Sequence, residues 1–260
     1  MRRVCEIYKV CLKTVFAQAA AYRANFILSM LITLISNILF PLITILIYQK
    51  GASFPEWSFW EVILIQAIYT IASGLAASLF SGVTWATMGH IKEGSYEIIL
   101  LKPLSPLLFL AATNIQLEGV GVIIGGMVMM AISLANLGGV GIGQWCQFIL
   151  LFVTGVGVLI GLFLIMAAIS FKWVGNSRIP EIFESVKTFG KYPLSIFPKA
   201  VQGIVTFLIP VGMVGFFPAS ALLGRLDLKA FWAMIPCVLF MLFGIWIYKK
   251  MIALYEGVGG

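Results

Sequence analysis

Residues 91–106 read IKEGSYEIILLKPLSP and form a polar stretch between two long apolar blocks. The charged residues of this stretch, in a chain of which only 10% is charged, are Lys92, Glu93, Glu97 and Lys102. A helix-sized core at residues 95–101 follows Gly94 and precedes Pro103, and both residue types favour helix boundaries. The pattern predicts a short helix outside the apolar blocks that docks on another protein.

The composition around this stretch excludes a soluble globular domain. Hydrophobic residues make up 61% of the 260 residues, and the mean hydropathy is +1.06. Soluble domains are roughly half apolar and roughly a quarter charged. We therefore expect an all-α polytopic membrane protein. The net charge of +7 is attributed to membrane topology and not to a nucleic-acid partner.

Six stretches meet the requirement of about 20 mostly apolar residues for a membrane-spanning helix. The expected spans, within a single transmembrane domain at residues 1–260, are 25–48, 59–83, 107–137, 145–171, 200–223 and 231–248. A charged loop is expected between the fourth and fifth spans. Glu118 lies inside the third span, where an acid is a functional candidate by default. An interfacial or bundle-facing structural role is favoured, because the most apolar part of that span begins after Glu118.

Residues 1–23 predict an amphipathic helix that lies in the membrane interface. Charged residues recur at helical spacing on one face, namely Arg2, Glu6, Lys9 and Lys13. Another face carries the small apolar residues Val4, Ile7, Cys11 and Val15. The alternative is that these residues are the irregular start of the first span.

The basic residues predict the orientation. With six spans both termini lie on the same side, and fourteen of the 17 Lys and Arg residues lie on that side. The other side holds only Lys50, Arg225 and Lys229. Because lysine and arginine accumulate on the cytoplasmic side of membrane proteins, both termini are expected to be cytoplasmic.

The fifth span is interrupted by Pro210, Gly212 and Pro218. Such breaks are tolerated in a membrane only where the freed backbone is buried in protein or lines a cavity. A re-entrant hairpin on the outer side is expected, and a simple proline kink is the alternative. The pairs Gly121/Gly125 and Gly157/Gly161 allow helices to approach closely, and we expect them to pack within the chain.

The sequence contains none of the common catalytic or nucleotide-binding motifs. There is no GxxxxGK[ST] or GxGxxG phosphate loop, no HExxH and no GxSxG. The four cysteines are scattered and form no CxxC pair, so no metal site is expected. The sequence therefore predicts neither an enzyme nor a cofactor on this chain.

Four features resemble the permease subunits of ABC transporters of the ABC-2 type, and more narrowly the bacterial six-span permeases similar to daunorubicin-type exporter permeases. The first is the N-terminal amphipathic helix. The second is the loop at 91–106, which is similar to the family pattern I-x-x-G … L-L-x-P-x-x. The third is KYPLSIFP at 191–198, similar to the start of the family's fifth span, and the fourth is the broken segment with Pro210 and Pro218.

The resemblance implies two permeases, identical or related but different, above two separate ATPase subunits that hold ATP and Mg in a bacterial inner membrane. Closure of the ATPases would push on a coupling helix at about 92–101. The candidate coupling residues are Lys92, Glu93, Gly94, Glu97, Ile98, Leu101, Lys102 and Pro103. Their charges can contact a groove of the ATPase, while Ile98, Ile99 and Leu101 supply apolar anchors. A solvated loop without a partner is the alternative.

The resemblance also implies export of a drug, lipid, glycan or peptide. We expect a pathway without charges, which favours a hydrophobic or amphipathic substrate. The alternative functions are a stand-alone channel or secondary carrier without an ATPase partner, and a permease that works only beside an unlike permease.

Overall fold

In this computed structural model, residues 2–51, 53–173, 178–226 and 228–255 are described, without the side chains of 2–8, 38–40 and 228–229. The described residues form helices and loops and contain no strand. The α-helices are α1 (Arg2–Ala21), α2 (Arg23–Gln49), α3 (Phe59–Ala76), α4 (Gly82–Lys92), α5 (Tyr96–Leu100), α6 (Pro106–Thr113), α7 (Gly119–Leu137), α8 (Ile142–Ser170), α9 (Arg178–Thr188), α10 (Lys199–Gly203), α11 (Gly212–Leu222) and α12 (Met234–Ala253). Two π-helical segments, η1 (Ala77–Ser81) and η4 (Ile204–Leu208), and three 3₁₀ segments, η2 (Phe189–Lys191), η3 (Leu194–Ile196) and η5 (Leu228–Ala233), connect them. The expected all-α fold is confirmed.

Five helices of the described residues are long and apolar enough to cross a membrane. Their bounds are Arg23–Gln49, Phe59–Lys92, Gly119–Leu137, Ile142–Ser170 and Ala230–Ala253. The bent pair Lys199–Leu208 and Gly212–Leu222 brings the number to six if it counts as one span. The chain is therefore a multi-pass membrane protein.

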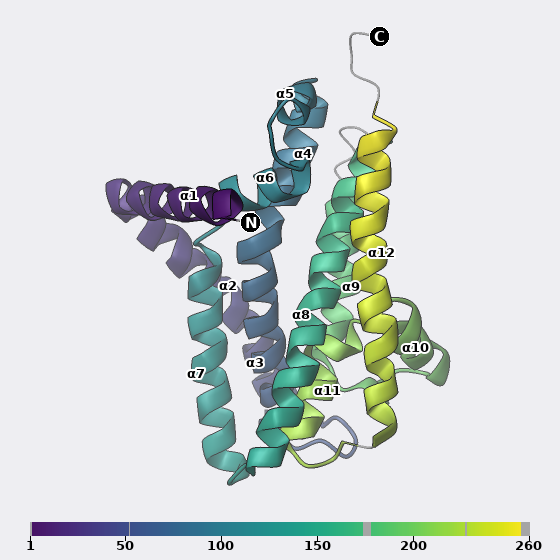
Figure 1. Cartoon of the computed structure of the whole chain (residues 1–260). Helices are drawn as coiled ribbons and strands as arrows, with labels where there is room; N and C mark the ends of the chain where they lie inside the picture. Colours follow the sequence, from purple (N-terminus) through teal and green to yellow (C-terminus); the bar gives the residue numbers. More distant parts are fainter. Residues whose placement is uncertain (1, 52, 174–177, 227, 256–260) are drawn as a thin grey trace.

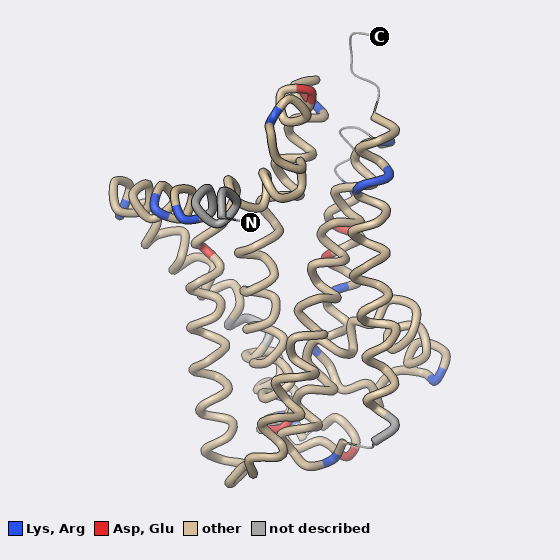
Figure 2. The backbone as a smooth tube through the Cα atoms, in the orientation of Figure 1, with Lys and Arg blue, Asp and Glu red and all other residues tan. Residues whose placement is uncertain are grey.

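The long helices form a bundle with two distinct ends (Figure 1). We call the upper end in Figure 1 the α5 end, because α4, α5 and the end of α12 lie there, and α1 lies across the bundle close to it. The opposite, loop end carries the α7–α8 connection at residues 138–141. Figure 2 shows Lys, Arg, Asp and Glu on α1, α5, α9, the end of α12 and the connections at the loop end, with few along the rest of the long helices.

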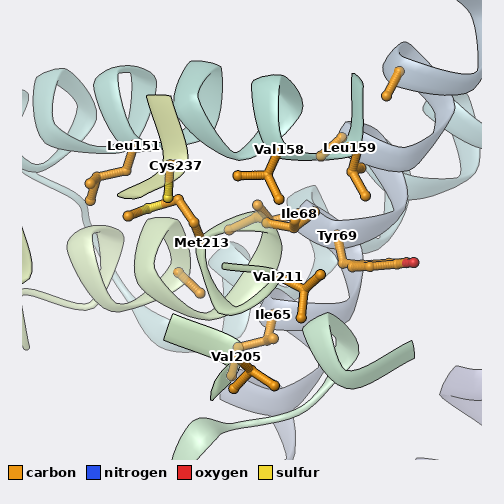
Figure 3. Packing of buried hydrophobic residues seen from close by; sticks show 14 of the residues in the cluster. Ile65, Ile68, Tyr69, Leu151, Val158, Leu159, Val205, Val211, Met213 and Cys237 are labelled. Carbon is orange, nitrogen blue, oxygen red and sulfur yellow. The ribbon is translucent and has the colours of Figure 1, made fainter. Parts of the chain in front are cut away.

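The core lies where α3, α8 and α11 meet (Figure 3). Its apolar side chains include Ile65, Ile68, Leu151, Val158 and Met213. Small residues bring these helices together, since a Cβ at Gly155 of α8 would lie 2.6 Å from the carbonyl oxygen of Met213 in α11. The apolar core thus fixes α11 against two membrane-spanning helices.

The glycine pairs pack against helices of the same chain. A Cβ at Gly121 would lie 2.4 Å from the Met30 side chain of α2. A Cβ at Gly244 of α12 would lie 2.7 Å from the carbonyl oxygen of Gly161 in α8. Both observations agree with the expected role in packing within the chain.

The second and third expected spans differ from the helices that form. The helix expected at 59–83 continues through η1 to Lys92, and the helix expected at 107–137 is interrupted between Thr113 and Gly119. The two irregularities face each other, because the backbone N–H of Gln116 donates to the carbonyl of Ser78 in η1 over 2.9 Å. A π-helical turn shifts the helical hydrogen-bond pattern. The carbonyl of Ser78 in this turn therefore accepts a hydrogen bond from the N–H of Gln116, which lies in the break of the third span.

The described part of the segment expected to be a charged loop after the fourth span packs against the bundle. Its first part forms α9, and a Cβ at Gly190 in η2 would lie 2.8 Å from the carbonyl oxygen of Val211. A Cβ at Gly215 of α11 would in turn lie 2.6 Å from the carbonyl oxygen of Gly190. The expected loop is therefore wrong, because two glycines allow this backbone to pack directly on α11.

Helix α1 occupies most of the predicted N-terminal amphipathic segment. Lys9 and Lys13 are exposed, while Cys11 and Val15 are half-buried, as the predicted faces require. The remaining residues of those faces, Arg2, Val4, Glu6 and Ile7, have side chains outside the described part of the chain.

Candidate functional site

The predicted docking stretch forms a turn and the short helix α5 at the end of α4. Gly94 has φ +69°, a left-handed conformation that glycine adopts without a steric penalty. The Gly94 N–H donates to the Ile91 carbonyl over 3.2 Å, and the Ser95 N–H donates to the His90 carbonyl over 2.8 Å. These are the two hydrogen bonds of a Schellman motif. The turn thus ends α4 and redirects the chain into α5.

Two residues of α5 anchor it to the rest of the chain, and the sequence predicted neither of these contacts within the chain. Tyr96 is fully buried and Ile99 is 2% exposed. The Tyr96 ring packs edge-on against Phe171 and Tyr255, with centroid distances of 5.0 and 5.4 Å. Burial, followed by the charge effect of Tyr248, raises the pKa of Tyr96 above its ordinary value, so its hydroxyl stays protonated. Ile99 was expected to contact a partner, and this assignment is wrong.

The other face of α5 and its flanking residues is exposed. Ile98 is 58% exposed and Leu101 is 84% exposed. The charged or turn residues predicted to surround them are also exposed, namely Lys92, Glu93, Glu97, Lys102 and Pro103. Two large apolar side chains surrounded by charges, on a helix whose opposite face is buried, form what we call the α5 surface.

The broken segment lies between η4 and α11, with Pro210 at the break. The two helical parts meet at an angle of 99°. Pro210 and Gly212 are buried, and a Cβ at Gly212 would lie 3.1 Å from the Leu194 side chain. The freed backbone is therefore covered by protein, as a break among membrane helices requires. Pro218 does not take part in the break, because it lies within α11 and that helix continues to Leu222.

Glu118 is not buried in the bundle. It is exposed at the start of α7 and lines a cavity of about 400 Å³ together with Gln18, Tyr22 and Asn25. Glu118 thus lies at the border of the apolar bundle beside α1, and its structural role stays a prediction.

A polar cluster at the loop end connects segments that are distant in the sequence. The Arg225 guanidinium lies 2.7 Å from the Glu61 carboxylate, whose side chain is 8% exposed. Arg225 also lies over the Trp57 ring, and the indole N–H of Trp57 donates to the Ser195 hydroxyl over 2.9 Å. The cluster ties the residues before α3 to η3 and to the residues after α11.

A cavity of about 310 Å³ lies within the bundle, among α2, α3, α7, α8 and α9. Its polar lining includes Asn37, Tyr69, Ser73, Glu184, Lys187 and Lys191. The hydroxyl of Tyr69 points away from the apolar core (Figure 3). The charges of this space were not expected, because Glu184, Lys187 and Lys191 lie in the segment predicted to be a loop outside the spans. The spacing of Glu184, Lys187 and Lys191 on one helical face was the signal that could have revealed it.

No group of acidic, histidine or cysteine residues within the described ranges could hold a metal ion.

The fold defines a multi-pass helical membrane protein with a short helix anchored at one end of its bundle. Residues 22–259 match the family model described as ABC-2 family transporter protein. The chain belongs to this family and is an ABC-2 type permease, which confirms the resemblance seen in the sequence. Comparisons with curated proteins and with solved structures gave no match.

Proposed function

We propose that the chain is the permease subunit of an ABC exporter in the cytoplasmic membrane of a bacterium. Separate ATPase subunits would bind ATP and Mg, while this chain would have no catalytic role. A second permease, identical or related, would complete the pathway, and both termini would be cytoplasmic. Family membership and the excess of Lys and Arg at the predicted inner side support this proposal.

The observation that carries the proposal is the two-sided character of α5. One side is anchored by Tyr96, and the other presents Ile98 and Leu101 among charged residues. Exposed apolar side chains with a charged rim are typical of a protein-binding surface. A helix that is exposed on one side and anchored on the other can receive a force from an ATPase.

The force has a defined route into the spans. Tyr96 contacts Tyr248 of α12 and Phe171 at the end of α8, and the α5 turn continues α4. A displacement of α5 would therefore move the ends of three long helices together. The break at Pro210 lies among the same helices, since α11 packs on α3 and α8.

The test is to co-purify the chain with the products of its neighbouring genes and to ask whether an ATPase is among the retained proteins. We compare Leu101→Asp with Leu254→Asp, because both leucines are exposed, at 84% and 63%, and lie at the α5 end of the bundle. Only Leu101 belongs to the α5 surface. Leu101→Asp should lose the ATPase, while Leu254→Asp should retain it.

Failure of the wild-type chain to retain any ATPase would overturn the proposal and favour a stand-alone channel or carrier. If the Leu101→Asp variant retained the ATPase at the wild-type level, the α5 surface would not be part of the interface with the ATPase. Size-exclusion profiles of both variants check that each remains folded.

A further inference from the structure

Arg225 is fixed to the end of α11 by the turn that follows this helix. Gly224 has φ +67°, and its N–H donates to the carbonyl of Ala221 over 3.1 Å. The N–H of Arg225 donates to the carbonyl of Ser220 over 2.9 Å. These are the two hydrogen bonds of a Schellman motif, with glycine at the position that needs a left-handed conformation. The backbone of Arg225 therefore moves together with the last turn of α11.

The side chain of Arg225 connects this turn to the start of α3. Its guanidinium lies 2.7 Å from the Oε1 atom of Glu61, whose side chain is only 8% exposed. The Oε2 atom of Glu61 accepts a hydrogen bond from the N–H of Ser58 over 2.8 Å, as part of the capping box at the start of α3. The capping box thus holds Glu61 on α3 independently of Arg225.

Trp57 connects the same arginine to further segments. The guanidinium carbon of Arg225 and the ring of Phe216 in α11 each lie 5.5 Å from the centre of a Trp57 ring. The indole N–H of Trp57 donates to the hydroxyl of Ser195 in η3 over 2.9 Å. The hydroxyl of Tyr48 in α2 donates to the carbonyl of Trp57 over 2.7 Å. Segments from α2, α3, η3 and α11 therefore meet around Arg225 and Trp57.

The other end of α11 adjoins the break at Pro210. Helix α11 is 11 residues long, begins at Gly212 and lies at 99° to the helical part that precedes it. Proline lacks the N–H that would continue a helical hydrogen-bond pattern. Hinges between rigid parts are a few residues at the end of an element that absorb the change in backbone angles. Helix α11 thus has the features of a hinge at its start and the contacts of Arg225 at its end.

The contacts of Arg225 are of the kind that can open without unfolding the bundle. The Arg225 side chain is 50% exposed. An ion pair in contact with water is weak, because solvent and salt screen it, and a cation–π contact adds a second modest attraction. These contacts hold the end of α11 in place, and a small applied force is enough to break them.

We propose that Arg225, Glu61 and Trp57 form a latch, which holds the end of α11 against α3 and η3. When the latch opens, α11 swings about the break at Pro210, and its buried side becomes accessible to water at the loop end. That a transported substrate leaves the bundle through this opening rests on the function proposed above, whereas the latch itself does not.

Opening is measured as the rate at which a buried cysteine reacts with a water-soluble maleimide. The full chain, with its native cysteines replaced, is studied in phosphatidylcholine nanodiscs without an ATPase. Ser220→Cys is the reporter, because Ser220 is 5% exposed and lies at the end of α11. Ser170→Cys is the reference, since Ser170 is 3% exposed and ends α8 at the α5 end of the bundle. Both hydroxyls donate only within their own helix, so the two substitutions are matched.

Two variants remove one charge each from the latch. Arg225→Gln should raise the labelling rate of Ser220→Cys about tenfold, the combined effect of losing an exposed ion pair and a cation–π contact. Glu61→Gln should raise it less, because the cation–π contact remains and glutamine can still complete the capping box. The double variant should react no faster than Arg225→Gln, because both residues act in one contact. Lys50→Gln is the control, since it removes an exposed positive charge at the end of α2 outside the latch.

Salt provides a readout that a loss of packing would not show. Raising the NaCl concentration to about 1 M, which screens exposed charges strongly, should speed labelling of Ser220→Cys when Arg225 is present. It should leave the rate of the Arg225→Gln variant unchanged. Equal labelling rates for Arg225→Gln and Lys50→Gln would overturn the proposal. An equal rise at Ser170→Cys would show a general loosening of the bundle, which also overturns it.

The latch and the proposed exporter can fail separately. If labelling depends on Arg225 but no ATPase associates with the chain, the latch is supported and the exporter proposal is wrong. If an ATPase associates but labelling does not depend on Arg225, the exporter proposal is supported and the latch is wrong.

Discussion

The hydroxyl oxygens of Tyr96 and Tyr248 lie 3.2 Å apart, and neither side chain is exposed. The hydroxyl of Tyr248 also shares a hydrogen bond of 2.9 Å with that of Thr87 in α4. Three buried hydroxyl groups thus connect α5, α12 and α4. This connection ties the exposed α5 surface to two helices of the bundle.

Tyr248→Phe should lower stability, because the hydroxyls of Tyr96 and Thr87 lose a shared partner inside the protein. Leaving a buried hydroxyl unsatisfied costs about 1–3 kcal/mol. We expect a lower melting temperature in detergent and weaker coupling of ATP hydrolysis to transport. Tyr22→Phe is the control, since Tyr22 is 69% exposed. An equal melting temperature for Tyr248→Phe and the wild type would show that the connection is not stabilising.

Gly94→Ala should weaken the turn between α4 and α5. A side chain at φ +69° costs about 1–2 kcal/mol, so the last turn of α4 should fray and α5 should lose its position. The expected result is reduced ATPase co-purification together with a lower melting temperature. Gly89→Ala is a matched control, because Gly89 is helical with open space at its Cβ position. Alanine there should be neutral or slightly stabilising, and a similar loss in both variants would contradict the assigned role of the turn.

Gly82→Ala should disturb the contact between the breaks of the second and third spans. A Cβ at this position would lie 1.8 Å from the carbonyl oxygen of Asn114, so one backbone must move. Overpacking of this kind costs about 1–3 kcal/mol or more. The variant should show a lower melting temperature and lower yield. Gly203→Ala, where nothing lies within 4 Å of the Cβ position, should behave as wild type. If the Gly82→Ala variant had the melting temperature of the wild type, the two breaks would not be in the close contact that the structure shows.

The parts of the fold that depend on local sequence were predictable. Long apolar runs gave α2, α8 and α12 close to their observed bounds, because length and hydropathy alone decide a span. Gly94 and Pro103 likewise located α5, since their backbone preferences do not depend on distant residues. The break at Pro210 was predictable for the same reason.

The parts that the sequence missed depend on long-range contacts. The third span is interrupted where the Gln116 N–H finds the Ser78 carbonyl on another helix. The segment after α8 enters the bundle because Gly190 meets Gly215 at close range. Tyr96 is anchored by residues far away in the sequence, among them Tyr248, 152 positions away. No local pattern contains such pairings, so the cavity with Lys187 and Lys191 also escaped prediction.

The orientation in the membrane gives the last prediction, because the α5 surface can meet an ATPase only from the cytoplasm. Single cysteines are introduced at Leu101 and at Gly139 in a variant whose native cysteines are replaced. Both positions are exposed, and they lie at opposite ends of the bundle. A membrane-impermeant maleimide should label Gly139→Cys in intact spheroplasts, whereas Leu101→Cys should react only after permeabilisation. Labelling of Leu101→Cys in intact spheroplasts would place the α5 surface outside the cell, where no ATP-driven subunit could push on it.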